Sequence, residues 1–135
     1  MDCETIKMEI PANPDYVSIL RLTISGIANK LGFSMDDIED MKVAVSEACT
    51  NAVKHSEGKK VNIRFNLLKN GIEIEIQDNG KGYDVNSIET PDLSNPKENG
   101  LGLFIIQTLM DEVNIESIGN QGTTIKMTKY LGVDI

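Results

Sequence analysis

Tryptophan is absent from this chain of 135 residues, and the other aromatic residues are only three Phe and three Tyr. A hydrophobic core must therefore be built mainly from Ile, Val, Leu and the six Met. Hydrophobic residues make up 40% of the chain and charged residues 25%, which is typical of a soluble globular domain. The length predicts one domain that spans residues 1–135.

Cysteine is scarce as well. The chain has two, Cys3 and Cys49, which are too few for a disulfide framework or a zinc cluster. Cys49 falls in an apolar helical stripe, so we expect it to be a small core residue rather than a reactive thiol.

Basic residues are outnumbered, because 13 Lys and Arg against 21 Asp and Glu give a net charge of −8. Nucleic-acid binding needs clustered Lys and Arg, so this balance argues against direct contact with nucleic acid. The acidic residues are spread along the chain, which is typical of a solvated surface. A surface that attracts a basic partner is the alternative.

Long hydrophobic runs are missing too. No run approaches the roughly 20 residues of a membrane-spanning helix. The first residues also lack the basic and apolar regions of a signal peptide. We therefore expect a cytoplasmic protein that makes no contact with a membrane.

Hydrophobic periodicity predicts the helices and strands. Apolar and polar residues alternate, as in half-buried strands, over residues 5–10, 61–67, 72–76, 113–118 and 123–130. Helical spacing, with start signals at Asn13 and Ser34 and a stop at Gly32, covers residues 14–31, 34–54 and 101–110.

The connections and the alternation of the strands predict the fold class. Lys69-Asn70-Gly71 is typical of a hairpin turn. Residues 83–99 lack periodicity, which predicts a long functional loop or, alternatively, a disordered insertion. Because every strand alternates, the sheet should bury one face only. The expected architecture is a two-layer α/β sandwich, with a mostly antiparallel mixed sheet and helices on one face.

Glu47 and Asn51 form a polar row in the second predicted helix. One helical turn separates them, so they project about 40° apart on the same face, and His55 would extend the row. A carboxylate and an amide oxygen suit Mg²⁺, which keeps most of its water. The carboxylate could also accept a proton from a hydroxyl or a water. A solvated helix face is the alternative.

Three glycine-containing segments follow. In Asp78-Asn79-Gly80-Lys81-Gly82 the glycines let a ligand approach the backbone, and Asp78 could accept a hydrogen bond from an amino group; a tight turn is the alternative. Gly100-Leu101-Gly102 precedes a predicted helix, where free N–H groups favour phosphate; a hinge or cap is the alternative. Gly122-Thr123-Thr124 offers a hydroxyl to a polar ligand or simply starts a strand.

Taken in order, these four motifs resemble the conserved boxes of the Bergerat-type ATPases and kinases, which include histidine-kinase catalytic domains and gyrase. Three further segments resemble the anti-sigma factor serine kinases of that superfamily. They are residues 41–52 (MKVAVSEACTNA), 109–113 (LMDEV) and 127–131 (MTKYL).

The resemblance implies a Bergerat fold with an ATP and Mg²⁺ site. In such a site Asn51 would hold Mg²⁺, and Asp78 and Thr123 would bind adenine. Other nucleotide contacts would come from Gly80, Gly82, Gly100, Leu101 and Gly102. Segment 83–99 has no arginine, so Lys81 and Lys97 are the candidates to neutralise the γ-phosphate, with solvent-facing lysines as the alternative. The last motif begins Asn120-Gln121-Gly122, where the superfamily often has Gly-x-Gly.

The resemblance also implies the activity. Glu47 would act as general base toward a serine of an anti-anti-sigma antagonist, Arg21 would face protein partners, and the protein would sequester a sigma factor as a homodimer. A nucleotide-gated anti-sigma binding protein without phosphotransfer is the alternative. An isolated histidine-kinase catalytic domain is a third reading, disfavoured because no phosphoacceptor helix pair accompanies it.

Overall fold

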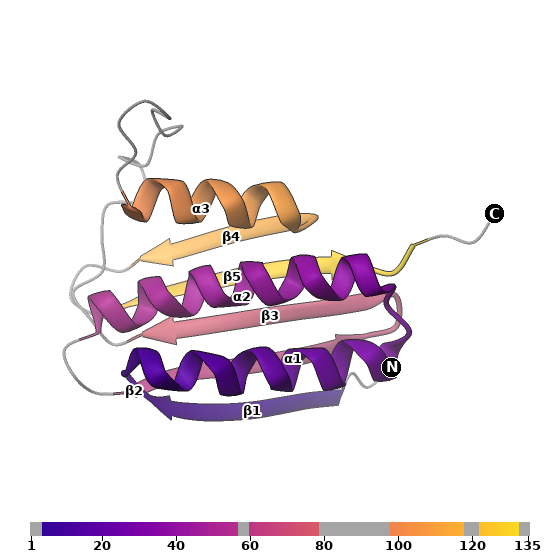
Figure 1. Ribbon diagram of the computed structural model, residues 1–135, viewed down its shortest axis with the longest axis horizontal. Coiled ribbons are helices and arrows are strands. Elements are labelled where there is room, and N and C mark those ends of the chain that lie inside the picture. The colour runs from indigo at the N-terminus through magenta and orange to yellow at the C-terminus, as the bar shows by residue number, and fades with distance from the viewer. Residues whose placement is uncertain (1–3, 57–59, 79–97, 118–121, 133–135) are drawn as a thin grey trace.

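The computed structural model describes residues 4–56, 60–78, 98–117 and 122–132. Its elements are β1 (Glu4–Pro11), the short 3₁₀ helix η1 (Pro14–Tyr16), α1 (Val17–Leu31), α2 (Met35–His55), β2 (Lys60–Leu68), β3 (Gly71–Asp78), α3 (Glu98–Leu109), β4 (Glu112–Ser117) and β5 (Thr123–Tyr130). Every predicted helix and strand is present, with ends that differ by a few residues. Figure 1 shows the three helices on one side of the sheet.

The sheet has five strands in the order β1-β2-β3-β5-β4, and each neighbouring pair is antiparallel. The predicted α/β sandwich with helices on one face is confirmed. The sheet is more uniform than expected, since the described pairings include no parallel one. β3 and β5 are thus central neighbours, although 44 residues separate the end of β3 from the start of β5 (positions 79–122).

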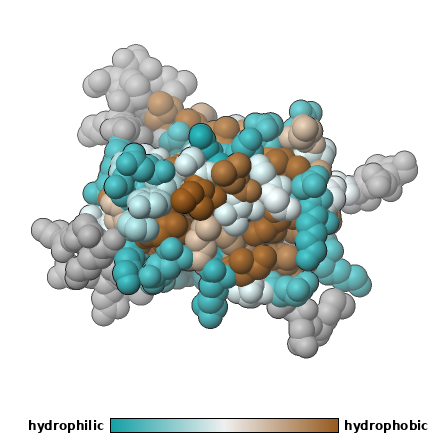
Figure 2. Space-filling model, turned by 60° about the horizontal axis from the view of Figure 1, so that its bottom comes forward, coloured by the Kyte–Doolittle hydropathy of each residue, from teal (hydrophilic) through white to brown (hydrophobic). Residues whose placement is uncertain are grey.

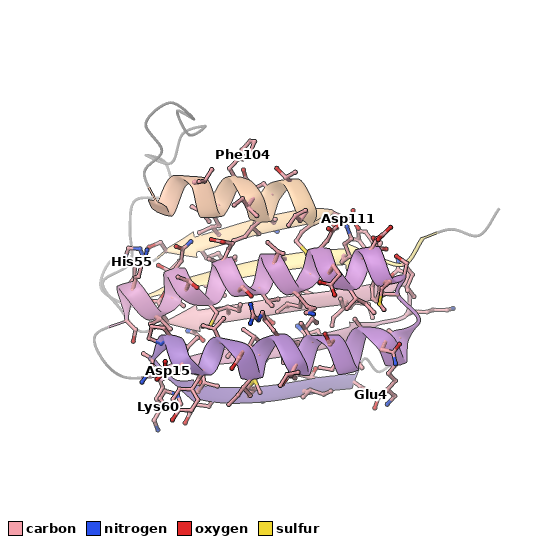
Figure 3. All side chains as sticks on the ribbon, viewed as in Figure 1. Glu4, Asp15, His55, Lys60, Phe104 and Asp111 are labelled. Atoms are coloured by element: carbon pink, nitrogen blue, oxygen red, sulfur yellow. The ribbon has the colours of Figure 1, made fainter. Side chains whose placement is uncertain are left out.

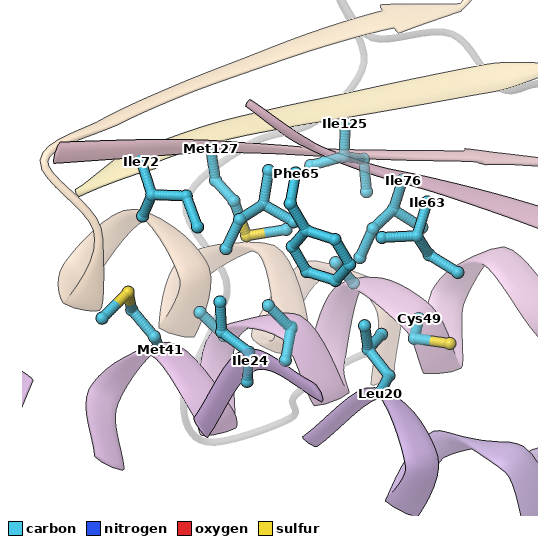
Figure 4. Packing of buried hydrophobic residues seen from close by; sticks show 14 of the residues in the cluster. Leu20, Ile24, Met41, Cys49, Ile63, Phe65, Ile72, Ile76, Ile125 and Met127 are labelled. Atoms are coloured by element: carbon cyan, nitrogen blue, oxygen red, sulfur yellow. The ribbon is translucent and has the colours of Figure 1, made fainter. Parts of the chain in front are cut away.

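The hydrophobic core fills the space between the helices and the sheet. Figure 4 shows Leu20 of α1 and Met41 of α2 below Phe65 and Met127 of the sheet, and all four side chains are fully buried. Cys49 is also buried, as predicted, and burial raises the pKa of its thiol to about 11. Aliphatic residues and methionine therefore supply most of the core of a chain that has no tryptophan, together with Phe33 and Phe65.

Local signals place the helix ends where the sequence predicts them. The Asn13 side chain accepts a hydrogen bond from the Asp15 amide (2.9 Å), and the Ser34 hydroxyl accepts one from the Asp37 amide (3.1 Å). Gly32 ends α1 with a φ of 95°, a left-handed conformation that favours glycine. The difference is at Pro14, which opens a 3₁₀ turn before α1.

The predicted hairpin between β2 and β3 is confirmed, but Gly71 lies in strand β3 and not in the turn. Lys69 and Asn70 form the turn, and Gly71 already pairs with Leu68 as part of β3. None of the described non-glycine residues has a positive φ, so the turn is not the type that Asn-Gly favours. A β-carbon on Gly71 would instead collide with the Lys129 carbonyl oxygen and lie 2.9 Å from the Tyr130 Cα atom of β5.

The start of α3 also differs from the prediction. The helix begins at Glu98 rather than at Leu101, so Gly100 and Gly102 lie inside it instead of preceding it. Residues 83–97 of the predicted loop lie outside the described residues.

The second face of the sheet is polar, as alternation predicts. There the Asn66 side-chain amide donates to Glu73 (2.9 Å) and to Glu75 (2.8 Å) on the neighbouring strand. Among the described residues, no helix is long and apolar enough to cross a membrane.

Candidate active site

Gly102 of α3 lies directly against the polar row of α2. A β-carbon at Gly102 would be 3.0 Å from the Oε2 atom of Glu47 and 3.5 Å from the Nδ2 atom of Asn51. The first distance is tight enough that the Glu47 carboxylate would have to shift, whereas the second is an ordinary contact, so glycine lets the backbone of α3 approach Glu47 closely. Three residues that the sequence predicts to share a site therefore meet at the α2–α3 contact.

The two α2 side chains sit at the boundary between core and surface. Asn51 is only 5% exposed, and Glu47 is half-buried one turn before it. The alternative interpretation of this row, a fully solvated helix face, is therefore excluded for Asn51. A buried amide and a neighbouring carboxylate provide oxygen atoms for a hard cation and a group that can accept a proton.

The N-terminal turn of α3 supplies further polar groups. The first four N–H groups of a helix have no partner within it, and in α3 they belong to residues 98–101. They include the amides of Gly100 and Leu101, so both remain candidates for binding an anion. The Gly102 amide lies beyond them, and the observed role of Gly102 is its close approach to α2.

Asp78 and Thr123 form a second buried polar pair. They are direct partners in the register of β3 and β5, and they are 3% and 2% exposed, respectively. The Thr123 hydroxyl also donates to the Ser117 hydroxyl of β4 at 3.3 Å. Figure 1 shows the end of β3 and the start of β5 at the same end of the molecule as the start of α3 and the end of α2.

Ser117 is a site neighbour that the sequence analysis missed. It belongs to no motif, and only the pairing of Ser117 with Thr123 in the β4–β5 register brings it to this position. A register prediction for the last two strands is the one signal that could have found it.

A surface groove of about 630 Å³ runs between α1 and α2 and ends at Glu47. Arg21 lies in it on an exposed stretch of α1, beside Leu22, which is 75% exposed. The other lining residues are Ser18, Glu39, Lys42, Val43 and Ser46. Glu47 thus has α3 on one side and an open groove on the other, and Arg21 shares that groove with it.

The remaining predicted residues fall outside this description. Gly80, Gly82, Lys81 and Lys97 lie outside the described residues. Within the described residues, no group of three or more His, Cys, Asp or Glu could hold a metal ion.

Comparisons with known proteins match most of the chain. Residues 10–129 match the family model of the histidine kinase-like ATPase domain. The serine-protein kinase RsbW of Bacillus cereus (strain AH820) is 48% identical, and the match covers 95% of this chain and 86% of the relative. The serine-protein kinase RsbW of Bacillus anthracis gives the same values.

Solved structures show the same fold. The chain matches a Mycobacterium tuberculosis protein containing RsbU and RsbW domains with a TM-score of 0.71 and 20% identity, over 95% of this chain and 32% of that one. The histidine kinase domain of a blue-light activated kinase from Erythrobacter litoralis matches with a TM-score of 0.56 and 20% identity, over 90% of this chain and 62% of that one. The match covers only part of each solved chain. At 20% identity these structures support the fold alone. The 48% identity to curated relatives and the match to the ATPase domain show that the chain belongs to the RsbW family of serine-protein kinases, as the sequence motifs predict.

Proposed function

We propose that the protein transfers the γ-phosphoryl group of Mg-ATP to a serine of an anti-anti-sigma antagonist, and that it holds a sigma factor inactive when it is not bound to that antagonist. The observation that carries this proposal is the position of Glu47, between the α3 backbone at Gly102 and the groove that contains Arg21. Family membership supports the serine kinase activity, and the site supports the roles of individual residues.

The nucleotide would span the end of the molecule where the two polar clusters lie. The buried carboxylate of Asp78 would accept a hydrogen bond from the adenine amino group, with the Thr123 hydroxyl beside it. The phosphates would lie toward the N-terminal turn of α3, where free N–H groups and the helix dipole favour anions. Asn51, a buried amide, would then contribute one oxygen ligand to Mg²⁺. A single protein ligand is enough, because Mg²⁺ usually takes its other ligands from substrate phosphates and water rather than from a cage of carboxylates.

In the phosphoryl transfer, the serine hydroxyl oxygen forms a bond to the γ-phosphorus as the bond to the β,γ-bridging oxygen breaks. ADP leaves with that electron pair, and Glu47 accepts the proton of the hydroxyl. The serine would reach Glu47 through the α1–α2 groove, with Arg21 contacting the partner protein. Product phosphoserine adds about −1.5 to −2 charges, and the kinase itself carries −8, so repulsion would promote release of the product.

We also propose that the protein acts in the cytoplasm as a homodimer. Two exposed apolar side chains on neighbouring elements, Ile6 of β1 and Ile19 of α1, offer a surface for association. Figure 2, which brings the lower side of Figure 1 forward, shows hydrophobic atoms gathered in the middle of a face with hydrophilic residues at its ends.

The test is to incubate the protein with labelled ATP, Mg²⁺ and the candidate antagonist, and to follow label on the antagonist serine. Glu47→Gln should bind ATP with unchanged affinity and transfer no label. The matched control is Glu39→Gln, which removes a carboxylate from the same groove and helix but lies about two turns before Glu47 along α2. Full activity of Glu47→Gln would exclude it as the base. Nucleotide-dependent sigma binding without label on any antagonist would instead support the binding protein without phosphotransfer.

A further inference from the structure

Lys129 connects the two helices of the candidate site at their far ends. Its side chain points from β5 to the helix side of the sheet and is only 12% exposed. The Nζ atom donates to the carbonyl oxygen of Leu109 at 2.7 Å, and it lies 3.9 Å from Oδ1 of Asp37. Leu109 is the last residue of α3, and Asp37 is in the first turn of α2.

The contact with Leu109 satisfies a backbone group that a helix leaves open, and the contact with Asp37 pairs the lysine with a carboxylate. The last carbonyl groups of a helix have no partner within it, and a cation at this end also interacts favourably with the helix dipole. A mostly buried ammonium group in turn needs acceptors, because an unpaired charge away from water is strongly unfavourable. One side chain therefore fixes the C-terminus of α3 to the N-terminus of α2.

This connection lies far from the candidate site but on the same two helices. Asp37 precedes Glu47 by ten positions (37 to 47), which is about 15 Å along α2. Leu109 follows Gly102 by seven positions (102 to 109), which is about 10 Å along α3. The helices therefore run in opposite directions, with Lys129 at one end of their contact and Gly102 nearer the other. Figure 3 shows Asp111, just after α3, and His55, at the end of α2, at opposite ends of the molecule.

The end of α3 has other attachments to β5, so loss of the lysine should not detach it. The Asp111 amide donates to the Thr128 carbonyl oxygen at 2.9 Å, and the Tyr130 amide donates to the Asp111 carboxylate at 2.7 Å. These two hydrogen bonds attach Asp111, which follows the helix, to β5. The Lys129 ammonium is the group that links the helix end itself to α2.

We propose that Lys129 is a positioning residue for the kinase reaction: it sets the position of α3 along α2, and thereby the contact at which Gly102 orients the Glu47 carboxylate. A small slide of α3 would place its backbone against Glu47 differently, or leave that carboxylate free to rotate. This inference rests on the proposed role of Glu47 as general base.

The experiment compares Lys129→Met with Lys129→Arg, which keeps a cation able to reach both acceptors. We expect Lys129→Met to lower kcat by about tenfold while the Kd for ADP changes by less than about threefold, since misplacement of a catalytic group affects the rate more than binding. Lys129→Arg should recover most of kcat. Asp37→Asn, which keeps the Leu109 hydrogen bond, should have an intermediate effect.

Lys126→Met is the matched control, because Lys126 lies on the same strand but pairs with Glu116 on the polar face, at 3.8 Å. Its kcat should be unchanged. Urea unfolding shows which variants remain folded. If Lys129→Met does not fold, Lys129→Gln is used in its place. Unchanged kcat in a folded Lys129→Met or Lys129→Gln variant, or an equal loss in Lys126→Met, overturns the positioning role. Full activity of Glu47→Gln overturns the proposed function instead, so the two failures are distinguishable.

Discussion

Gly102 and Glu47 are so close that a β-carbon on the glycine would lie 3.0 Å from the carboxylate Oε2 atom. The contact joins a backbone position of α3 to the side chain proposed as general base. Because the carboxylate is half-buried and lies against the α3 backbone, a methyl group added at Gly102 would have to displace it. The effect of added volume at this position can therefore be predicted in sign.

Gly102→Ala should impair the kinase without unfolding it. The methyl group forces the Glu47 carboxylate to shift by a few tenths of an ångström, and we expect kcat to fall by about tenfold. Alanine is also a better helix former than glycine by about 1 kcal/mol, so the free energy of unfolding should stay equal or rise. Paired kinetics and urea titration test this, and loss of activity with matching loss of stability would contradict it.

Asp78→Asn should abolish ATP binding. The amide would present a donor where the proposal requires an acceptor, at a position that is 3% exposed, and such a mismatch costs on the order of 1–3 kcal/mol or more. Isothermal titration calorimetry with ATP measures the loss, and Asp36→Asn, on the exposed first turn of α2, is the control. Unchanged affinity would show that Asp78 does not bind adenine.

Gly71→Ala should destabilise the fold through the β3–β5 pairing. A β-carbon there meets the backbone of Lys129 and Tyr130, which can move only if the two central strands separate locally. Overpacking of this kind costs about 1–3 kcal/mol. The urea midpoint should fall accordingly.

In contrast, Gly26→Ala should raise the free energy of unfolding by about 0.5–1 kcal/mol. The new methyl group has no atom within 4 Å, and Gly26 lies on an exposed part of α1.

Cys49 should resist alkylation in the folded protein. Burial raises the pKa of its thiol to about 11, so at pH 8 only about one molecule in a thousand carries the reactive thiolate. In a Cys3→Ser background, iodoacetamide should label Cys49 only after unfolding in urea. The folded-state pKa lies above the ordinary value of 9.0, so the stability from this group is present below about pH 9 and is lost as the pH rises toward 11. Rapid labelling of the native protein at pH 8 would contradict the burial of this thiol.

The sequence predicts α2 well because its signals are local. The Ser34 cap and the apolar spacing are read within a few residues, and the same helix carries the Glu47–Asn51 row. The family was predictable for another reason, since four ordered motifs span most of the chain. The predicted roles of all the site residues, including Glu47, Asn51 and Asp78, stay predictions.

Other features depend on contacts that a linear pattern does not contain. α3 begins at Glu98 because packing against α2 outweighs the weak helix propensity of Gly100 and Gly102. The importance of Gly71 comes from a strand far away in sequence, and Lys129 is one of many lysines until β5 is placed. For Gly71 and Lys129 the register of the sheet decides, and the sequence gives that register no local signal.

The pairing of Asp78 with Thr123 also has a consequence for synthesis of the chain. These partners are 45 positions apart (78 to 123), and β5 is the last strand in sequence although it lies beside the central β3. At translation rates of about 5–20 residues per second, Asp78 is added to the chain roughly 2–9 seconds before its neighbour. During that interval the nascent chain has the polar row of α2 but lacks the β5 partner of Asp78. If Asp78 and Thr123 bind adenine as proposed, ATP can stabilise the fold only after β5 has joined β3.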